Sequence, residues 1–268
     1  MNHDNETAPA SSLEAKDREL FDRIAPSYFE KDLTESSRIA RKRRLLKTSE
    51  TCERSSLGDL LEVGCGGGFV AEYLKGEYAT YCGVDYSENL IAFAVERHSD
   101  DNVEFHACNI KDFEQDRMFD VVLMVGVLHH LDDMQGILGQ ILARVRPGGL
   151  IVVNEPHPGN PLVTLLRKIR KKTDSNYSED QVELSWDELK GVFEDAGLED
   201  VRLKAQGIFS TPFAEVVLRP QGLFAPLAKV ACLLDDLLEH LPTPILKFLT
   251  WNIVAVGRKP DPADTGKR

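Results

Sequence analysis

The chain has 268 residues, of which 42% are hydrophobic and 28% charged, enough for one full α/β domain with insertions. Its formal net charge of −12 argues against nucleic-acid binding, because phosphate backbones repel an acidic protein. No stretch has the roughly 18 to 20 uninterrupted apolar residues of a membrane-spanning helix, and no targeting signal is evident. The five cysteines are widely spaced and odd in number, as expected for reduced thiols, so we expect a cytoplasmic protein.

Composition divides the chain into segments. The first residues are polar and predict a disordered tail, and a charged stretch with helical periodicity follows. Short β-branched runs then alternate with helical patterns, which is typical of a parallel sheet covered by helices on both faces. We expect a disordered tail 1–15, N-terminal cap helices 16–56, a main domain 57–260 with insertions 156–184 and 212–250, and a tail 261–268.

Local signals mark several boundaries. The sequence Arg146-Pro147-Gly148-Gly149 predicts the end of a helix and a turn into a strand at 150–155. Ser185 and Glu188 predict a capping box at the start of another helix. The apolar stretch 218–249 contains four prolines, which we expect to break it.

Two basic runs stand out in this acidic chain. Both interpretations of them remain open at this stage: solvated helix faces, or a positive rim around the site of an anionic partner. The first run contains Arg38, Arg41, Lys42, Arg43, Arg44 and Lys47, and the second contains Arg167, Lys168, Arg170, Lys171 and Lys172.

A glycine-rich segment, LLEVGCGGGF at 60–69, predicts a buried strand that turns into a helix. Glycines let the backbone approach a ligand closely, and the free N–H groups at a helix start attract anions. Phe69 occupies the position where a dinucleotide site needs Gly or Ala, which disfavours NAD. Asp85 ends the next predicted strand, where its carboxylate could accept hydrogen bonds from two ribose hydroxyls. Asn109 and Ile110 follow a third strand and could contact an adenine edge.

The ordered set of motifs resembles the class I S-adenosylmethionine-dependent methyltransferases of the small-molecule type. The matching segments are ExGxGxG at 62–68, the acidic Asp85, CNIKDF at 108–113, FDVVLMVGVLHHL at 119–131 and ARVRPGGLIVV at 143–153. The resemblance implies a Rossmann-like seven-stranded sheet whose last strand, at 251–258, is antiparallel and inserted beside the strand at 201–209. Helices would cover both faces, and the N-terminus and insertions would form a helical cap.

The resemblance also implies a binding role for individual residues. The methionine end of S-adenosylmethionine would lie near the glycine loop, its ribose on an acidic side chain, its adenine near the third strand, and its sulfonium against backbone of the fourth. The corresponding residues are Glu62, Gly64, Cys65 and Gly66 for methionine, Asp85 for ribose, Tyr86, Asn109 and Ile110 for adenine, and Val125 with Gly126 for the sulfonium. Many members of the family have Asp at the position of Asn109, but an amide can also contact adenine.

Catalytic candidates follow the predicted strands. His129 or His130 could act as a general base, and Glu155 could orient the histidine or contact the acceptor. The alternative is that the histidines only begin a helix behind the cofactor. Tyr28 lies in FDRIAPSY, which resembles the entry helix that folds over the cofactor in this family. No group of side chains has the sequence spacing of a metal site, so we expect none.

The two insertions are candidates for the acceptor cap. Leucines in 218–249 recur at helical spacing, which indicates a helix packed on the core, at a dimer contact, or over the acceptor. An apolar cap with basic neighbours would suit an amphiphilic or anionic acceptor, or a membrane surface.

We therefore expect methyl transfer from S-adenosylmethionine to the oxygen of a small molecule, with S-adenosylhomocysteine as product. Transfer to nitrogen or carbon, and a non-catalytic subunit that only binds the cofactor, remain alternatives, as does an NAD-dependent oxidoreductase. The chain is expected to be a monomer or a homodimer without a nucleic-acid partner.

Overall fold

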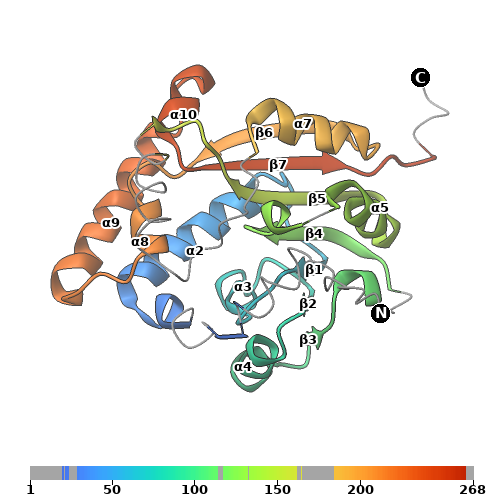
Figure 1. Ribbon diagram of the computed structural model, residues 1–268, viewed down its shortest axis with the longest axis horizontal. Helices are drawn as coiled ribbons and strands as arrows, with labels where there is room; N and C mark the ends of the chain where they lie inside the picture. The colour runs from blue at the N-terminus through green and yellow to red at the C-terminus, as the bar shows by residue number, and fades with distance from the viewer. Residues whose placement is uncertain are drawn as a thin grey trace, which may run out of the picture.

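A computed structural model describes residues 20, 22–23, 29–113, 117–131, 133–161, 164 and 184–263 (Figure 1). Three of the predictions fall outside these residues: the disordered tail 1–15, the side chain of Tyr28 and the basic run 167–172. All five cysteines lie within them, and each has a free thiol.

One seven-stranded sheet runs through the molecule in the order β3-β2-β1-β4-β5-β7-β6. The first five strands pair in parallel, whereas β7 pairs antiparallel with both of its neighbours, β5 and β6. The predicted Rossmann-like sheet with an inserted antiparallel last strand is confirmed. The strands are β1 Asp59–Val63, β2 Thr80–Asp85, β3 Val103–Ala107, β4 Phe119–Val125, β5 Val145–Pro156, β6 Glu199–Gln206 and β7 Asn252–Arg258.

Helices cover both faces of the sheet (Figure 1). Side chains alternate along each strand, so Ile151 and Val153 face one hydrophobic core with α5 and α7, while Leu150 and Val152 face a second core with α2 and α3. The helices are α2 Glu35–Glu50, α3 Phe69–Tyr73, α4 Glu88–His98, α5 Met134–Arg144, α7 Trp186–Asp195, α8 Thr211–Glu215, α9 Gln221–Leu238 and α10 Thr243–Leu249, with single turns η1 Ile110–Asp112 and η2 Leu128–His130.

The start of β5 and the effect of Pro226 on α9 differ from the sequence predictions, whereas the start of α7 agrees with them. Strand β5 already begins at Val145, so the Pro-Gly-Gly turn lies within the strand rather than before it; Gly148 still has a positive φ of 70°. Pro226 does not break α9, because a proline near the start of a long helix removes only one of its many hydrogen bonds. The capping box of Ser185 and Glu188 is confirmed.

The first basic run is neither a solvated face nor a free positive rim. Its arginines point into the molecule and form ion pairs with acids from several other elements. The pairs are Arg38 with Glu72, Arg41 with Asp32, Arg44 with Glu215, and Arg43 with Asp235, Asp236 and Glu239. Arg43 is only 8% exposed, and it fastens α2 to α9. The solvated interpretation holds for Lys42, which is exposed, but not for Arg43, whose partner acids lie almost 200 residues away in the chain.

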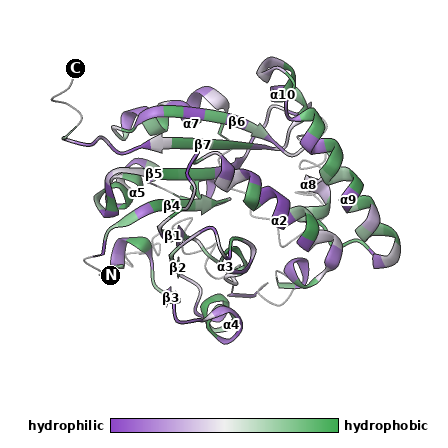
Figure 2. Ribbon diagram, turned by 180° about the vertical axis from the view of Figure 1, so that it is seen from behind, coloured by the Kyte–Doolittle hydropathy of each residue, from purple (hydrophilic) through white to green (hydrophobic). Residues whose placement is uncertain are grey.

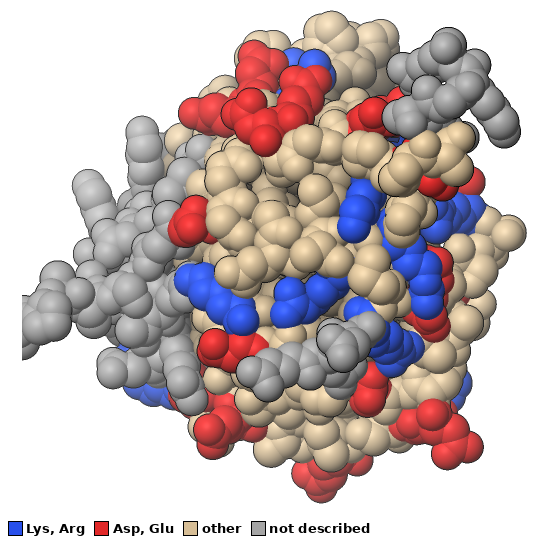
Figure 3. Space-filling model, turned by 90° about the vertical axis from the view of Figure 1, so that its right-hand side faces the viewer, with Lys and Arg blue, Asp and Glu red and all other residues tan. Residues whose placement is uncertain are grey.

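Ion pairs also join elements at the opposite end of the sheet, where the parallel strands begin. Arg146 lies 2.7 Å from carboxylate oxygens of both Asp59 and Asp120. Figure 3 shows Lys and Arg side chains in the middle of the face at this end, with Asp and Glu beside them. Interleaved charges of this kind are typical of an ordinary protein surface.

Asp235 joins α9 to the loop between β6 and α8. Its carboxylate is completely buried and accepts hydrogen bonds from the amides of Ile208, Phe209 and Ser210, at 2.8–3.2 Å, and from the Ser210 hydroxyl, at 2.6 Å. A buried carboxylate is tolerated only when donors surround it in this way. Asp235 is therefore a structural residue that positions the segment before α8.

Replacing Asp235 by alanine should lower the free energy of unfolding by about 3 kcal/mol, because three backbone amides lose their acceptor and the buried Arg43 loses one of its three acidic partners. The neighbouring Asp236→Ala is the matched control: its side chain is 42% exposed, and the loss should be below about 1 kcal/mol. Urea denaturation of both variants measures the difference. Equal losses would contradict the structural role of Asp235.

Candidate cofactor pocket and adjacent acid–base pair

A pocket opens at the carboxyl ends of β1, β2 and β4. This is the edge where open α/β sheets bind ligands. The structure brings most of the predicted cofactor residues together on its wall, although they come from four separate segments of the chain. Those on the wall are Gly64, Gly66, Asp85, Tyr86, Asn109, Ile110, Val125, Gly126 and His130.

The glycine loop is shaped by backbone that other residues could not adopt. Gly64 and Gly68 have φ values of 73° and 74°. A Cβ at Gly64 would lie 2.5 Å from Val127 Cγ2, and one at Gly68 would lie 2.7 Å from the ring of Phe105. Both positions therefore require glycine. Because glycine has no side chain, the backbone of the loop at Gly64 and Gly66 forms the pocket wall itself.

Asp85 holds the loop and lines the pocket at the same time. One of its oxygens accepts the amide of Gly66 and the other accepts the amide of Ser87, each at 2.9 Å. Burial raises the pKa of the Asp85 carboxyl, while the two amide hydrogen bonds oppose that shift. The carboxylate is thus fixed in position, with acceptor capacity left for a ligand hydroxyl.

Glu62 and Cys65, two of the predicted cofactor residues, do not line the pocket. Glu62 is 2% exposed and accepts a hydrogen bond from the phenol of Tyr81, and burial raises the pKa of its carboxyl. The Cys65 side chain is also buried, and burial raises the pKa of its thiol. Glu62 belongs to β1 and contacts Tyr81 of β2, and the Cys65 side chain turns toward Gly83 of β2, so both lie against the sheet and not on the pocket wall.

The adenine candidates lie on one side of the pocket. Asn109 caps the short turn η1 by accepting the amide of Lys111 at 3.0 Å, and Ile110 is buried beneath it. An asparagine can cap a turn as well as an aspartate can. The departure from the family pattern therefore leaves the cap of this turn intact.

Glu155 ends β5 and organises the turn after β4. Its Oε1 accepts the amides of Val127 and Leu128 at 2.9 and 2.8 Å, and its Oε2 lies 2.6 Å from His129 Nδ1. The carboxylate is 1% exposed, so all its hydrogen bonds are made within the protein. A buried carboxylate beside one imidazole nitrogen favours a proton there and leaves the other nitrogen basic.

The two adjacent histidines point differently. His130 lines the cofactor pocket, whereas His129 is 8% exposed and turns toward Glu155; their ring centroids are 4.1 Å apart. The His129 ring lies just behind the pocket wall, since a Cβ on Gly126 would be 3.7 Å from its Cε1.

Two contributors to this region were missed by the sequence analysis. Phe29 stacks on Phe93 with ring centroids 3.8 Å apart and lies over Gly67, so the N-terminal segment packs on the glycine loop. Arg41 pairs with Asp32 at 2.6 Å, and the charges of both act on Glu62. Aromatic spacing around Tyr28 could have suggested Phe29, but nothing in the basic run distinguished Arg41.

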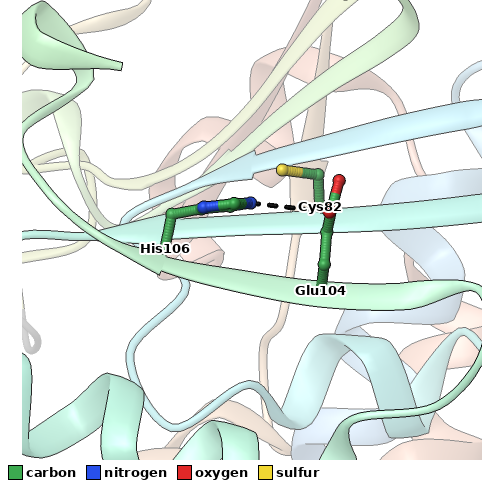
Figure 4. A group of neighbouring side chains, drawn as sticks. All are labelled: Cys82, Glu104 and His106. Atoms are coloured by element: carbon green, nitrogen blue, oxygen red, sulfur yellow. Dashed lines mark ion pairs between the residues drawn. The ribbon is translucent and has the colours of Figure 1, made fainter. Parts of the chain in front are cut away.

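Three side chains outside the pocket have the chemistry of metal ligands, although their sequence spacing did not indicate a site. Cys82 on β2 lies beside Glu104 and His106 on β3 (Figure 4). Arg117 occupies one oxygen of Glu104 at 2.8 Å, and burial together with Glu104 raises the pKa of Cys82 to about 12. A cation would have to displace Arg117 from Glu104 and a proton from the Cys82 thiol. We therefore interpret the three side chains as a contact between the neighbouring strands β2 and β3.

Comparison with known proteins agrees with this geometry. The model of a methyltransferase domain family matches residues 32–203, well over half of the chain. A ubiquinone biosynthesis O-methyltransferase of Rickettsia felis is 23% identical over 151 residues, which are 54% of this chain and 62% of that protein. One from a Bradyrhizobium species is 33% identical over 98 residues, covering 35% and 38% of the two chains. The chain thus spans about three-fifths or less of the length of these relatives.

Solved structures share the fold. A methyltransferase of Thermotoga maritima, described as a possible histamine N-methyltransferase, superposes with a TM-score of 0.63 at 20% identity, covering 90% of this chain and 98% of that one. Magnesium protoporphyrin IX methyltransferase of Synechocystis, with bound S-adenosylhomocysteine, gives 0.60 at 10% identity, covering 92% and 100%.

The chain belongs to the methyltransferase domain family, and it has the fold of the class I S-adenosylmethionine-dependent methyltransferases. The alternative of an NAD-dependent oxidoreductase is thereby dropped. S-adenosylmethionine is the cofactor of this family, and the residues on the pocket wall fit it: a fixed carboxylate for ribose and close backbone approach at the glycine loop.

Replacing Asp85 by asparagine should weaken binding of S-adenosylhomocysteine roughly 10- to 100-fold, because the amide nitrogen would face backbone N–H groups and disturb both loop and ribose contacts. Isothermal titration calorimetry measures the dissociation constant. Asp101→Asn, at an exposed turn, is the control and should change nothing. An unchanged affinity in the Asp85 variant would remove the ribose assignment.

Proposed function

We propose that the protein transfers the methyl group of S-adenosylmethionine to an oxygen of a small molecule. The observation that carries the proposal is the buried His129–Glu155 pair, whose histidine lies directly behind the cofactor pocket. The names of the O-methyltransferase relatives support the choice of oxygen. S-adenosylhomocysteine would be the second product.

The pocket wall would hold the cofactor through its own polar groups. Asp85 would accept hydrogen bonds from the ribose hydroxyls, and the glycine loop would let the backbone approach the methionine end. When bound, the cofactor supplies an electrophilic methyl group for in-line displacement. The remaining contacts would be Tyr86, Asn109 and Ile110 around the adenine and Val125 with Gly126 beside the sulfonium.

His129 would act as the general base. Its Nδ1 hydrogen bond to Glu155 leaves Nε2 to accept the hydroxyl proton as the acceptor oxygen attacks the methyl carbon. Glu155 would be a positioning residue, since its other oxygen is held by two backbone amides and cannot rotate away. His130, on the pocket wall, would contact the cofactor or acceptor.

The acceptor would be enclosed by the parts of the chain outside the core sheet. We propose a single domain in which segments 16–56, 156–184 and 212–250 form this cap, of which α2, α8, α9 and α10 are described. The apolar character of 212–250 favours an amphiphilic acceptor, which could carry an anionic group. The sequence is compatible with a monomer or a homodimer.

Nitrogen is the second candidate acceptor, because a structural neighbour is described as a possible N-methyltransferase. A neutral amine requires no general base before attack, so loss of His129 would matter little for it. The behaviour of a His129 variant therefore distinguishes the two reactions, and a chain that binds cofactor without turnover would be a non-catalytic subunit.

Incubation with S-adenosylmethionine labelled in its methyl group and fractionated cell extract should label a small molecule, identified by mass spectrometry. His129→Asn should reduce the labelling rate at least about 100-fold through loss of proton removal. Binding of S-adenosylhomocysteine should stay within about twofold, since His129 does not line the cofactor pocket. His240→Asn, on an exposed side chain, is the matched control. Full activity of His129→Asn would exclude the base assignment.

A further inference from the structure

Helices α9 and α10 leave an extended apolar face without cover in the described part of the chain. Leu233, Leu237 and Phe248 are 68%, 70% and 65% exposed, although each is a large hydrophobic side chain. Patches of this kind usually mark a binding surface. We call this the outer face; its other members are Leu223, Leu227, Val230, Leu234, Leu241, Ile245 and Leu249, all at least 37% exposed.

The acids near the C-terminal end of α9 are not among the members of the outer face. The three acids, Asp235, Asp236 and Glu239, turn toward Arg43 of α2, with the nearest oxygens 2.9–3.7 Å from its nitrogens. The cation Lys229 is exposed and directly precedes Val230 of the outer face. In a protein with a net charge of −12, the outer face is thus free of acids.

The outer face lies at the functional end of the molecule. In Figure 1, α8, α9 and α10 are at the end toward which the parallel strands run, the same end as the cofactor pocket. Figure 2 shows much of α9 in the colour of hydrophobic residues. A surface that binds this face would lie beside the site rather than behind the molecule.

We propose that the outer face of α9 and α10 docks on the surface of a lipid bilayer. Its leucines and Phe248 would enter the boundary between headgroups and acyl chains, and the adjacent Lys229 would reach lipid phosphates. The protein would lie on the membrane with the pocket end facing it. This docking uses a different surface from the proposed catalytic pair and does not depend on the identity of the acceptor.

The composition of the outer face favours lipid over a second copy of the chain. Protein interfaces combine an apolar centre with about one hydrogen bond per 100–200 Å² and are enriched in aromatic residues and Arg. The outer face instead offers leucine, valine and isoleucine with one phenylalanine, and no acid or amide for pairing across a two-fold axis. Absence of acids is what a negatively charged bilayer requires, because anionic lipids repel carboxylates.

Co-sedimentation of the full chain with phosphatidylcholine vesicles, with and without phosphatidylglycerol, tests the proposal. The wild type should bind both, and Leu237→Glu should weaken binding at least tenfold, because a buried carboxylate opposes insertion. Lys229→Glu should reduce only the preference for anionic vesicles, by about fivefold. Val95→Glu, on a 46% exposed side chain of α4, is the matched control and should bind as the wild type does.

Circular dichroism and S-adenosylhomocysteine binding establish that each variant is folded. Light scattering without lipid measures the oligomeric state of the wild type and of Leu237→Glu, which tests whether the outer face instead binds a second copy of the chain. A wild-type dimer that Leu237→Glu converts to monomer would overturn the proposal in favour of a self-contact, and so would a wild type that stays in solution with both kinds of vesicle.

Discussion

A buried carboxylate has to be surrounded by hydrogen-bond donors, and this constraint organises the functional end of the sheet. Asp85, Glu155 and Asp235 all lie in loops or at element ends, and each accepts backbone amides that would otherwise have no partner there. Backbone and carboxylate therefore fix one another. The glycine loop, the turn carrying the histidines and the segment before α8 each owe their position to one such group.

Two of these carboxylates, Asp85 and Glu155, would serve different parts of the proposed reaction. Asp85 holds the glycine loop and still has lone pairs for a ribose, so the donor side is preformed. Glu155 holds the turn after β4 and directs His129 from behind the pocket wall. In the proposed reaction, donor binding would depend on the end of β2 and proton removal on the end of β5. Strands β1 and β4 separate the two, so a change of one carboxylate need not disturb the other.

Helix α9 is held against α2 by ion pairs together with small buried side chains, while α2 itself packs on the sheet through the second hydrophobic core. Arg43 draws the acids of α9 inward, and the small residues Ala225, Ala228 and Ala231 let that side of the helix approach α2 closely. The large apolar residues of α9 are consequently left on its outer side. The contact between α2 and α9 therefore decides which side of α9 is exposed, and this is the surface that we assign to a bilayer.

Local patterns in the sequence predicted the alternation of strands and helices and the glycine loop, because alternating hydrophobicity and required glycines act over a few residues. The inserted last strand was implied by the resemblance to a known family. The local patterns also predicted Asp85 and Asn109 at the pocket, since residues that follow parallel strands meet at one edge. They could not predict that Glu62 turns into the core, that His129 and not His130 meets Glu155, or that Arg43 is buried. Those outcomes depend on partners between 19 and 196 residues away in the chain, and only the packed sheet and helices bring such groups within hydrogen-bonding distance.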